Sequence, residues 1–238
     1  MTNIAVYKNS IPGHVQEQVV DLVRANLTDL CMHAIPQSNF MFAVYQYAIA
    51  VEVQMYLDVI AHTQKIPAEI AIAFAADNPA KVVGFILYLP LQSHPEACGV
   101  TYMAVASECR RKGTAKAMMA EVIKRYPHVE LTCSPAKVPY YEKMGFQMLR
   151  ARDTQVVMNS RDHTSQGLMQ ILDVAPIYQS DEVKQVHSAL VQRFGLRAMV
   201  DAEKQLERHL KQLSYKASAF VKERQQSIIE KHLVGVET

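Results

Sequence analysis

The chain has 238 residues, of which half are hydrophobic and 20% are charged, and its formal net charge is +2. This composition is typical of a globular protein with a sizeable core and excludes a disordered chain. The near balance of charges also argues against a protein dedicated to nucleic-acid binding, which would carry a strong basic excess.

The cysteines and the N-terminal residues bear on the cellular compartment and on metal binding. The cysteines form no CxxC pair and none lies beside a histidine at zinc-ligand spacing; they are Cys31, Cys98, Cys109 and Cys133. This pattern predicts free thiols and no metal site. The first 14 residues lack the basic region and apolar run of a secretory signal. The sequence therefore predicts a cytoplasmic protein.

The N-terminal part alternates from a strand to two helices. We predict a short strand at 4–9, a helix over 14–33 and a long helix from about 39 to 62. The last segment is apolar enough to be tested as a membrane span. Glu52 and Gln54 lie near its middle, where polar groups are costliest in a bilayer, so we predict a helix buried in a protein core and no membrane contact.

A strand-rich block follows. The expected elements are strands at 68–76, 81–91 and 97–106, a helix at 114–125, a strand at 128–134, a helix at 138–145 and a strand or hairpin at 146–160. The order β-α-α-β-β-β-α-β-α-β predicts an α/β (α+β) sheet domain that occupies residues 1–160.

Residues 161–238 form a predicted helical C-terminal extension, with helices at 181–194 and 196–233. From Leu206 to Phe220 the apolar steps are 4, 3, 4 and 3, which is a short heptad seam. Such a stripe must be buried. We predict a homo-oligomer, most simply a two-fold dimer, formed through these helices. The alternatives are that the seam clamps the preceding domain or is covered by the helix 181–194.

The loop that follows the 97–106 strand has the composition of a phosphate site. Gly113 and Ala115 are small, so a ligand can approach the backbone, and the N–H groups of the loop and of the next helix converge on one place. Arg110, Arg111 and Lys112 add positive charge. Neither a Walker A loop nor GxGxxG is present. By itself this pattern does not distinguish a pyrophosphate site from an ordinary turn. The neighbouring sequence motifs favour the pyrophosphate site.

Those surroundings resemble a known family. The loop fits the pattern Arg/Gln-x-x-Gly-x-Gly/Ala, Val105 stands five residues before Arg110, and residues 141–146 read Tyr-Glu-Lys-Met-Gly-Phe. In this combination and order the chain resembles the GNAT superfamily of acetyl-CoA-dependent N-acetyltransferases over roughly residues 1–160. The resemblance implies a mixed, mostly antiparallel central sheet flanked by helices.

The resemblance also implies roles for individual residues. Tyr141 matches the tyrosine that protonates the departing CoA thiolate. The strand residues that would pair with the pantetheine arm of acetyl-CoA are Met103, Ala104 and Val105. The loop residues that would hold its pyrophosphate are Arg110, Arg111, Lys112, Gly113, Thr114, Ala115 and Lys116.

The chain departs from the family at three positions. Ser134 replaces a frequent asparagine, and Lys137 replaces a frequent alanine. Gly99 stands where some protein-acetylating members carry a glutamate, so no carboxylate is present there. His94, Glu96 and Tyr102 are the nearby groups that would serve as a base, directly or through water, and a water relay without a single base is equally open.

The implied activity is direct transfer of an acetyl group from acetyl-CoA to a primary amine on a small molecule or a protein. The alternative is a catalytically silent module that binds CoA and serves assembly, which the missing carboxylate and the helical extension favour mildly. A third reading, acetylation of the amine of a charged tRNA, ranks low because the net charge is only +2.

Overall fold

The computed structural model describes residues 3–63 and 66–234, and a seven-stranded sheet forms its centre. The strands are β1 (Asn3–Tyr7), β2 (Glu69–Phe74), β3 (Val82–Pro90), β4 (Ala97–Val105), β5 (His128–Cys133), β6 (Gln147–Arg152) and β7 (Gln155–Asn159). Their order is β1-β2-β3-β4-β5-β7-β6, and every neighbouring pair is antiparallel except β4 and β5. The predicted mixed, mostly antiparallel sheet is confirmed.

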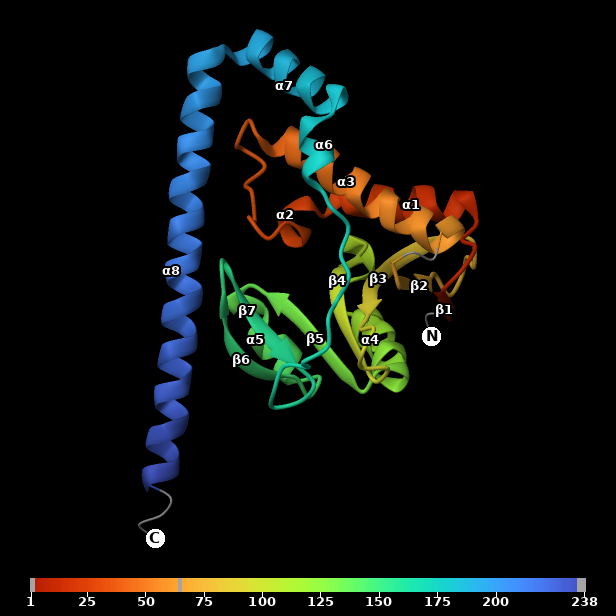
Figure 1. The fold of residues 1–238 in the computed structure, drawn as a ribbon, viewed down its shortest axis with the longest axis vertical. Coiled ribbons are helices and arrows are strands. Elements are labelled where there is room, and N and C mark those ends of the chain that lie inside the picture. Colours follow the sequence, from red (N-terminus) through yellow and green to blue (C-terminus); the bar gives the residue numbers. More distant parts are fainter. Residues whose placement is uncertain (1–2, 64–65, 235–238) are drawn as a thin grey trace.

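Helices cover both faces of this sheet (Figure 1). One face carries α1 (Gly13–Ala25), α2 (Leu27–Leu30) and α3 (Phe42–Asp58), which a π-helical turn (Val59–Thr63) prolongs. The other face carries α4 (Thr114–Arg125) and α5 (Val138–Glu142). Because β2 and β3 are covered on both sides, they are almost continuously apolar, as the sequence shows.

The apolar helix α3 is covered from two directions. It packs on α1 and, on its outer side, on α6 (Ala175–Gln179) and α7 (Asp181–Phe194). Val44 and Ala48 of α3 form a small separate core with Ile177 and Val183. A helix that is apolar nearly all round is thereby buried inside protein, as predicted. Within residues 3–63 and 66–234, no helix combines the length and apolar character that a bilayer span requires.

Local details correct some expectations. The predicted continuous helix over 14–33 is wrong, because α1 ends at Ala25 and Asn26 interrupts it. The Asn26 side chain donates a hydrogen bond to the Leu22 carbonyl at 2.7 Å, a local bond that competes with helix continuation. Of the two alternatives predicted for 146–160, a strand or a hairpin, the structure shows the hairpin. The five-residue helix α6 was not predicted, since one turn carries no readable period.

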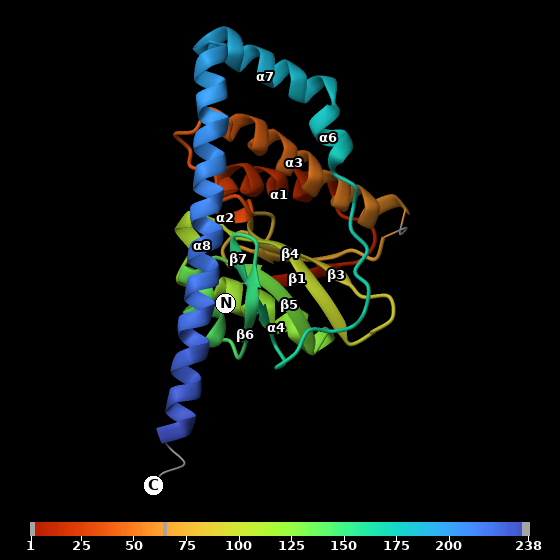
Figure 2. The ribbon, with the colours of Figure 1, turned by 60° about the vertical axis from the view of Figure 1, so that its left-hand side comes forward.

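The C-terminal helix α8 (Leu196–Val234) runs along the β6–β7 edge of the domain (Figures 1 and 2). Leu206 belongs to the core under α1 and α3, and Val221 to the core on the α4 side. Asn39 donates a hydrogen bond from its side chain to the Ala202 carbonyl at 3.0 Å. The helix therefore packs part of its stripe against its own domain, the clamp alternative, while Leu210, Leu213 and Phe220 are half-buried. Self-association stays a prediction, as does the domain boundary at residue 160.

Candidate active site

The central strands β4 and β5 separate half-way along their length. They pair in parallel only from Ala97–Gly99 of β4 to His128–Glu130 of β5. Beyond Gly99, β4 keeps β3 on one edge, and no described strand pairs with its other edge. The unpaired N–H and C=O groups of 100–105 therefore face a cleft, where an extended ligand can pair with them.

This cleft opens into a cavity of about 940 Å³. Its walls come from the free edge of β4, from α2 and α3, from β5 and α5, and from the segment that follows β7. Six of the residues predicted from the sequence line it: Met103, Ala104, Val105, Arg110, Ala115 and Tyr141. The structure thus brings the strand, the loop and the tyrosine of the predicted site around one space.

The loop between β4 and α4 has the backbone of an anion site. Gly113 has a φ of +82°, a left-handed conformation that favours glycine, and Arg111 has a φ of +61°. No side chain caps α4, so the N–H groups of its first turn are open to a ligand. Thr114 is buried and its hydroxyl lies 3.5 Å from the Cys109 carbonyl. Arg111, Lys112 and Lys116 are exposed and do not line the cavity.

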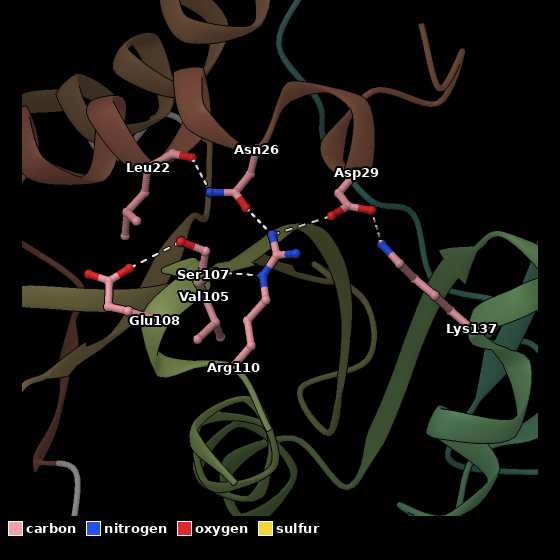
Figure 3. Close-up of polar contacts among 8 residues, drawn as sticks. All are labelled: Leu22, Asn26, Asp29, Val105, Ser107, Glu108, Arg110 and Lys137. Atoms are coloured by element: carbon pink, nitrogen blue, oxygen red, sulfur yellow. Dashed lines mark hydrogen bonds and ion pairs between the residues drawn. The ribbon is translucent and has the colours of Figure 1, made fainter. Parts of the chain in front are cut away.

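Arg110 and Lys137 meet at the mouth of the cleft through Asp29 of α2 (Figure 3). One Asp29 oxygen lies 2.9 Å from the Lys137 ammonium and the other lies 3.4 Å from the Arg110 guanidinium. Arg110 also donates to the Asn26 side chain and, at 3.2 Å, to the Val105 carbonyl. Both walls of the cleft thus present a cation at its mouth. The sequence analysis expected the charge of Arg110 at the pyrophosphate loop. Its guanidinium instead lies beside Asn26, Asp29 and the Val105 carbonyl.

Tyr141 is held by α5 with its side chain buried in the cavity wall. Its ring packs edge-on against Phe146, with centroids 5.8 Å apart. Burial raises the pKa of Tyr141 above its ordinary value. The hydroxyl therefore stays protonated at neutral pH and acts as a hydrogen-bond donor.

Of the three bases considered from the sequence, only Tyr102 lines the cavity. His94 and Glu96 are exposed on the β3–β4 turn. The Tyr102 hydroxyl lies close enough to Glu52 of α3 to lower the pKa of that carboxyl, and Glu52 lines the same cavity. Sequence reasoning missed Glu52 as a functional group. Its signal was a carboxylate in the middle of an otherwise apolar helix.

The segment 161–174, here called the strap, joins β7 to α6 and passes in front of β5 and β4 in Figure 1. Several of its residues, among them Met169 and Leu172, line the cavity. Its backbone bonds to the β3–β4 turn and to α3: Gln92 N–H donates to the Leu168 carbonyl at 3.3 Å, and Leu172 N–H donates to the Tyr56 hydroxyl at 3.2 Å. A Cβ added at Gly99 would lie 2.4 Å from the sulfur of Met169. Met169 thus fills the space that a side chain at position 99 would need.

Residues 69–148 match the family model of the acetyltransferase (GNAT) domain. The chain contains a GNAT acetyltransferase domain. It is accordingly an acyltransferase by domain class. A search of curated protein sequences found no significant match.

Two solved structures share the fold of this chain. The PaiA N-acetyltransferase of Thermoplasma acidophilum, in complex with coenzyme A, has a TM-score of 0.51 and 16% identity; the match covers 67% of this chain and 99% of that one. A histone acetyltransferase HPA2-related protein of Corynebacterium glutamicum has a TM-score of 0.50 and 17% identity, and covers 69% of this chain and 98% of that one. At these identities the matches show the fold.

Proposed function

We propose that this protein transfers an acetyl group from acetyl-CoA to a primary amine within one ternary complex. The observation that carries the proposal is the common cavity of the free β4 edge, the loop before α4 and Tyr141. The related fold of the PaiA N-acetyltransferase, solved with coenzyme A, supports the choice of donor.

The donor would lie along the cleft. Its pantetheine amides would pair with the free edge at Met103, Ala104 and Val105, in the manner of an added strand. Its pyrophosphate would accept hydrogen bonds from the N–H groups between Arg111 and Lys116. The Arg110 and Lys137 cations at the mouth, now joined through Asp29, would attract the remaining phosphate charge.

The reaction then needs three contributions from the chain. The cavity holds the amine nitrogen against the thioester carbon, which makes the attack effectively unimolecular. A backbone N–H of the strand near Val105 polarises the carbonyl oxygen. When the carbon–sulfur bond breaks, its electron pair goes to sulfur, and Tyr141 donates a hydrogen bond or proton to that thiolate. The acceptor proposed is a primary amine on a small molecule or a protein.

The cofactor assignment is tested by thermal unfolding with and without CoA. A ligand that binds only the folded protein raises Tm, and we expect that rise for the wild type. Gly113→Val should abolish it, because the side chain would stand where the pyrophosphate approaches. Nothing within the protein fills that space, since an added Cβ at Gly113 meets no atom within 4 Å.

Gly195→Val provides a matched control. Gly195 has a φ of +86°, close to that of Gly113, and an added Cβ there also meets nothing within 4 Å. Both variants should therefore lose stability through backbone strain, while only Gly113→Val should lose the response to CoA. The assigned phosphate site is refuted if millimolar CoA does not raise the Tm of the wild type. It is also refuted if CoA raises the Tm of Gly113→Val and Gly195→Val equally.

A further inference from the structure

Beyond the β4 edge, the cavity ends in a chamber between α3, the sheet and α6. We call it the acceptor chamber; its lining includes Cys31, His33, Tyr45, Glu52, Tyr56, Tyr102 and Tyr178. His33 packs edge-on against Tyr45 at 5.5 Å, and Tyr45 against Tyr178 at 6.0 Å. The chamber is thus walled by aromatic rings, and Glu52 supplies its carboxylate.

Glu52 has no cationic partner among the described residues. None of the ion pairs among the described residues includes it. The groups that face it are the Tyr102 hydroxyl from β4, Tyr56 from its own helix, Cys31 from the loop after α2, and Tyr178 from α6. All four are neutral at pH 7, so a cation placed in the chamber would meet one uncompensated carboxylate.

Glu52 is half-buried, and Glu69, a buried carboxylate of the same protein, shows the contrast. Glu69 accepts hydrogen bonds from Tyr88 at 3.0 Å and Tyr126 at 2.8 Å, and it pairs with Arg125 at 2.9 Å. That group is fully satisfied by the fold, as buried charges ordinarily are. Glu52 has only the Tyr102 hydroxyl as a neighbouring donor and lines the open cavity, which leaves room for a ligand to complete its partners.

We propose that Glu52 binds the ammonium group of the acceptor and takes up its proton, so that the catalytic carboxylate of this enzyme comes from α3 rather than from β4. The inference rests on the proposed acetyl transfer. It further assigns the acceptor's class: a primary amine with no carboxylate beside the reactive nitrogen, its body packed among tyrosine rings that favour cations.

The proton balance of the step is complete. The ammonium group gives one proton to the Glu52 carboxylate, and the free amine forms a bond to the thioester carbon. As the carbon–sulfur bond breaks, the second proton leaves the nitrogen and the thiolate is protonated by way of Tyr141. The products are an amide, the CoA thiol and the proton on Glu52, which passes to solvent.

The position of Met169 explains why the carboxylate lies on another element. Its sulfur occupies the space above Gly99, so the strap and a side chain at that β4 position exclude each other. The opposite residue of β5, Glu130, also lines the cavity, but its carboxylate accepts a hydrogen bond from Asn159 at 3.1 Å. Glu130 is the main rival for the role, and His33 is the second.

The pH dependence of kcat separates these groups. Burial raises the pKa of Glu52, and the Tyr102 hydroxyl lowers it in part. Because the charged form accepts the proton, kcat should rise with pH along a limb above the ordinary carboxyl range. Glu52→Gln should remove this limb and lower kcat by about 10² to 10³-fold, the range of general-base catalysis. Asp58 is exposed on the same helix, so Asp58→Asn is the control. It should keep both the acidic limb and the wild-type kcat.

Tyr102→Phe tests the same group without removing it. Loss of the hydroxyl that lowers the pKa of Glu52 should move the acidic limb to higher pH while the maximal kcat falls only modestly. The acidic limb should persist in Glu130→Gln and in His33→Asn, whatever the size of their kcat. If either of those two variants abolishes the limb while Glu52→Gln retains it, the assignment of Glu52 is wrong.

Matched acceptors test the substrate class. We expect 2-phenylethylamine to be acetylated with a kcat/KM about tenfold or more above that of phenylalanine, because the amino acid's carboxylate would face Glu52 at like charge. CoA release is measured, and the CoA-induced rise in Tm is followed separately in every variant. A wild type that does not bind CoA refutes the proposed function itself. CoA binding with no amine turned over, or with phenylalanine preferred, refutes only this inference.

Discussion

At the scale of single residues, burial acts on two acids with opposite consequences. It raises the pKa of Tyr141, which keeps an already protonated phenol as a donor over the whole range of an assay. It also raises the pKa of Glu52, which brings the titration of a carboxylate closer to neutrality, where a base is most useful. One physical cause thus separates a candidate proton donor from a candidate proton acceptor within one cavity.

Removing the donor should slow the chemistry and spare the binding of CoA. We expect Tyr141→Phe to lower kcat by about a hundredfold, within the range of general-acid catalysis, with an unchanged Kd for CoA. Tyr140→Phe is the matched control, since Tyr140 precedes it on α5 and is 43% exposed. Steady-state kinetics at saturating acceptor, with Kd from calorimetry, measure both. An unchanged kcat in Tyr141→Phe would remove this hydroxyl from the mechanism.

At the scale of elements, the sequence predicted most of the sheet and helices because their apolar periods are local. The resemblance indicated Tyr141 and the β4 loop, and the structure brings them to one cavity. The pairing of Glu52 with Tyr102 could not be predicted in this way. The two residues are 50 positions apart, and only the shared core beneath α1 and α3 brings them together. The strap was equally hidden, because residues 161–174 have no regular period.

The docking of the strap can be tested through the one glycine that it covers. Gly99→Ala would place a Cβ against Met169, so we expect a loss of about 1 kcal/mol in the free energy of unfolding, the low end for overpacking because a methionine side chain adapts. In a Met169→Ala background the same change should cost almost nothing. Urea unfolding of the four proteins gives this coupling. Equal costs in the two backgrounds would mean that Met169 does not rest on Gly99.

At the scale of the whole molecule, α8 joins parts of the domain that are far apart in sequence. Its buried side chains contact both hydrophobic cores, and Arg224 pairs with Glu142 of α5 at 2.5 Å. The helix that carries the heptad seam therefore already has a partner within one chain. The seam is thus partly covered within one chain, and dimerisation through it stays a prediction.

The two roles of α8 make different predictions for stability. Leu206 is 6% exposed in a single chain, so Leu206→Ala should lower the free energy of unfolding by about 2 to 3 kcal/mol, through lost burial and the cavity left behind. Tyr215→Ala, at a side chain that is 75% exposed on the same helix, should change it little.

If the seam is buried within one chain, the Tm difference between wild type and Leu206→Ala stays constant over about a hundredfold range of protein concentration. A seam that joined two chains would instead make Tm rise with concentration in the wild type, because folding and association would be coupled. Calorimetry over that range, with light scattering on the same samples, distinguishes the clamp from the predicted dimer interface.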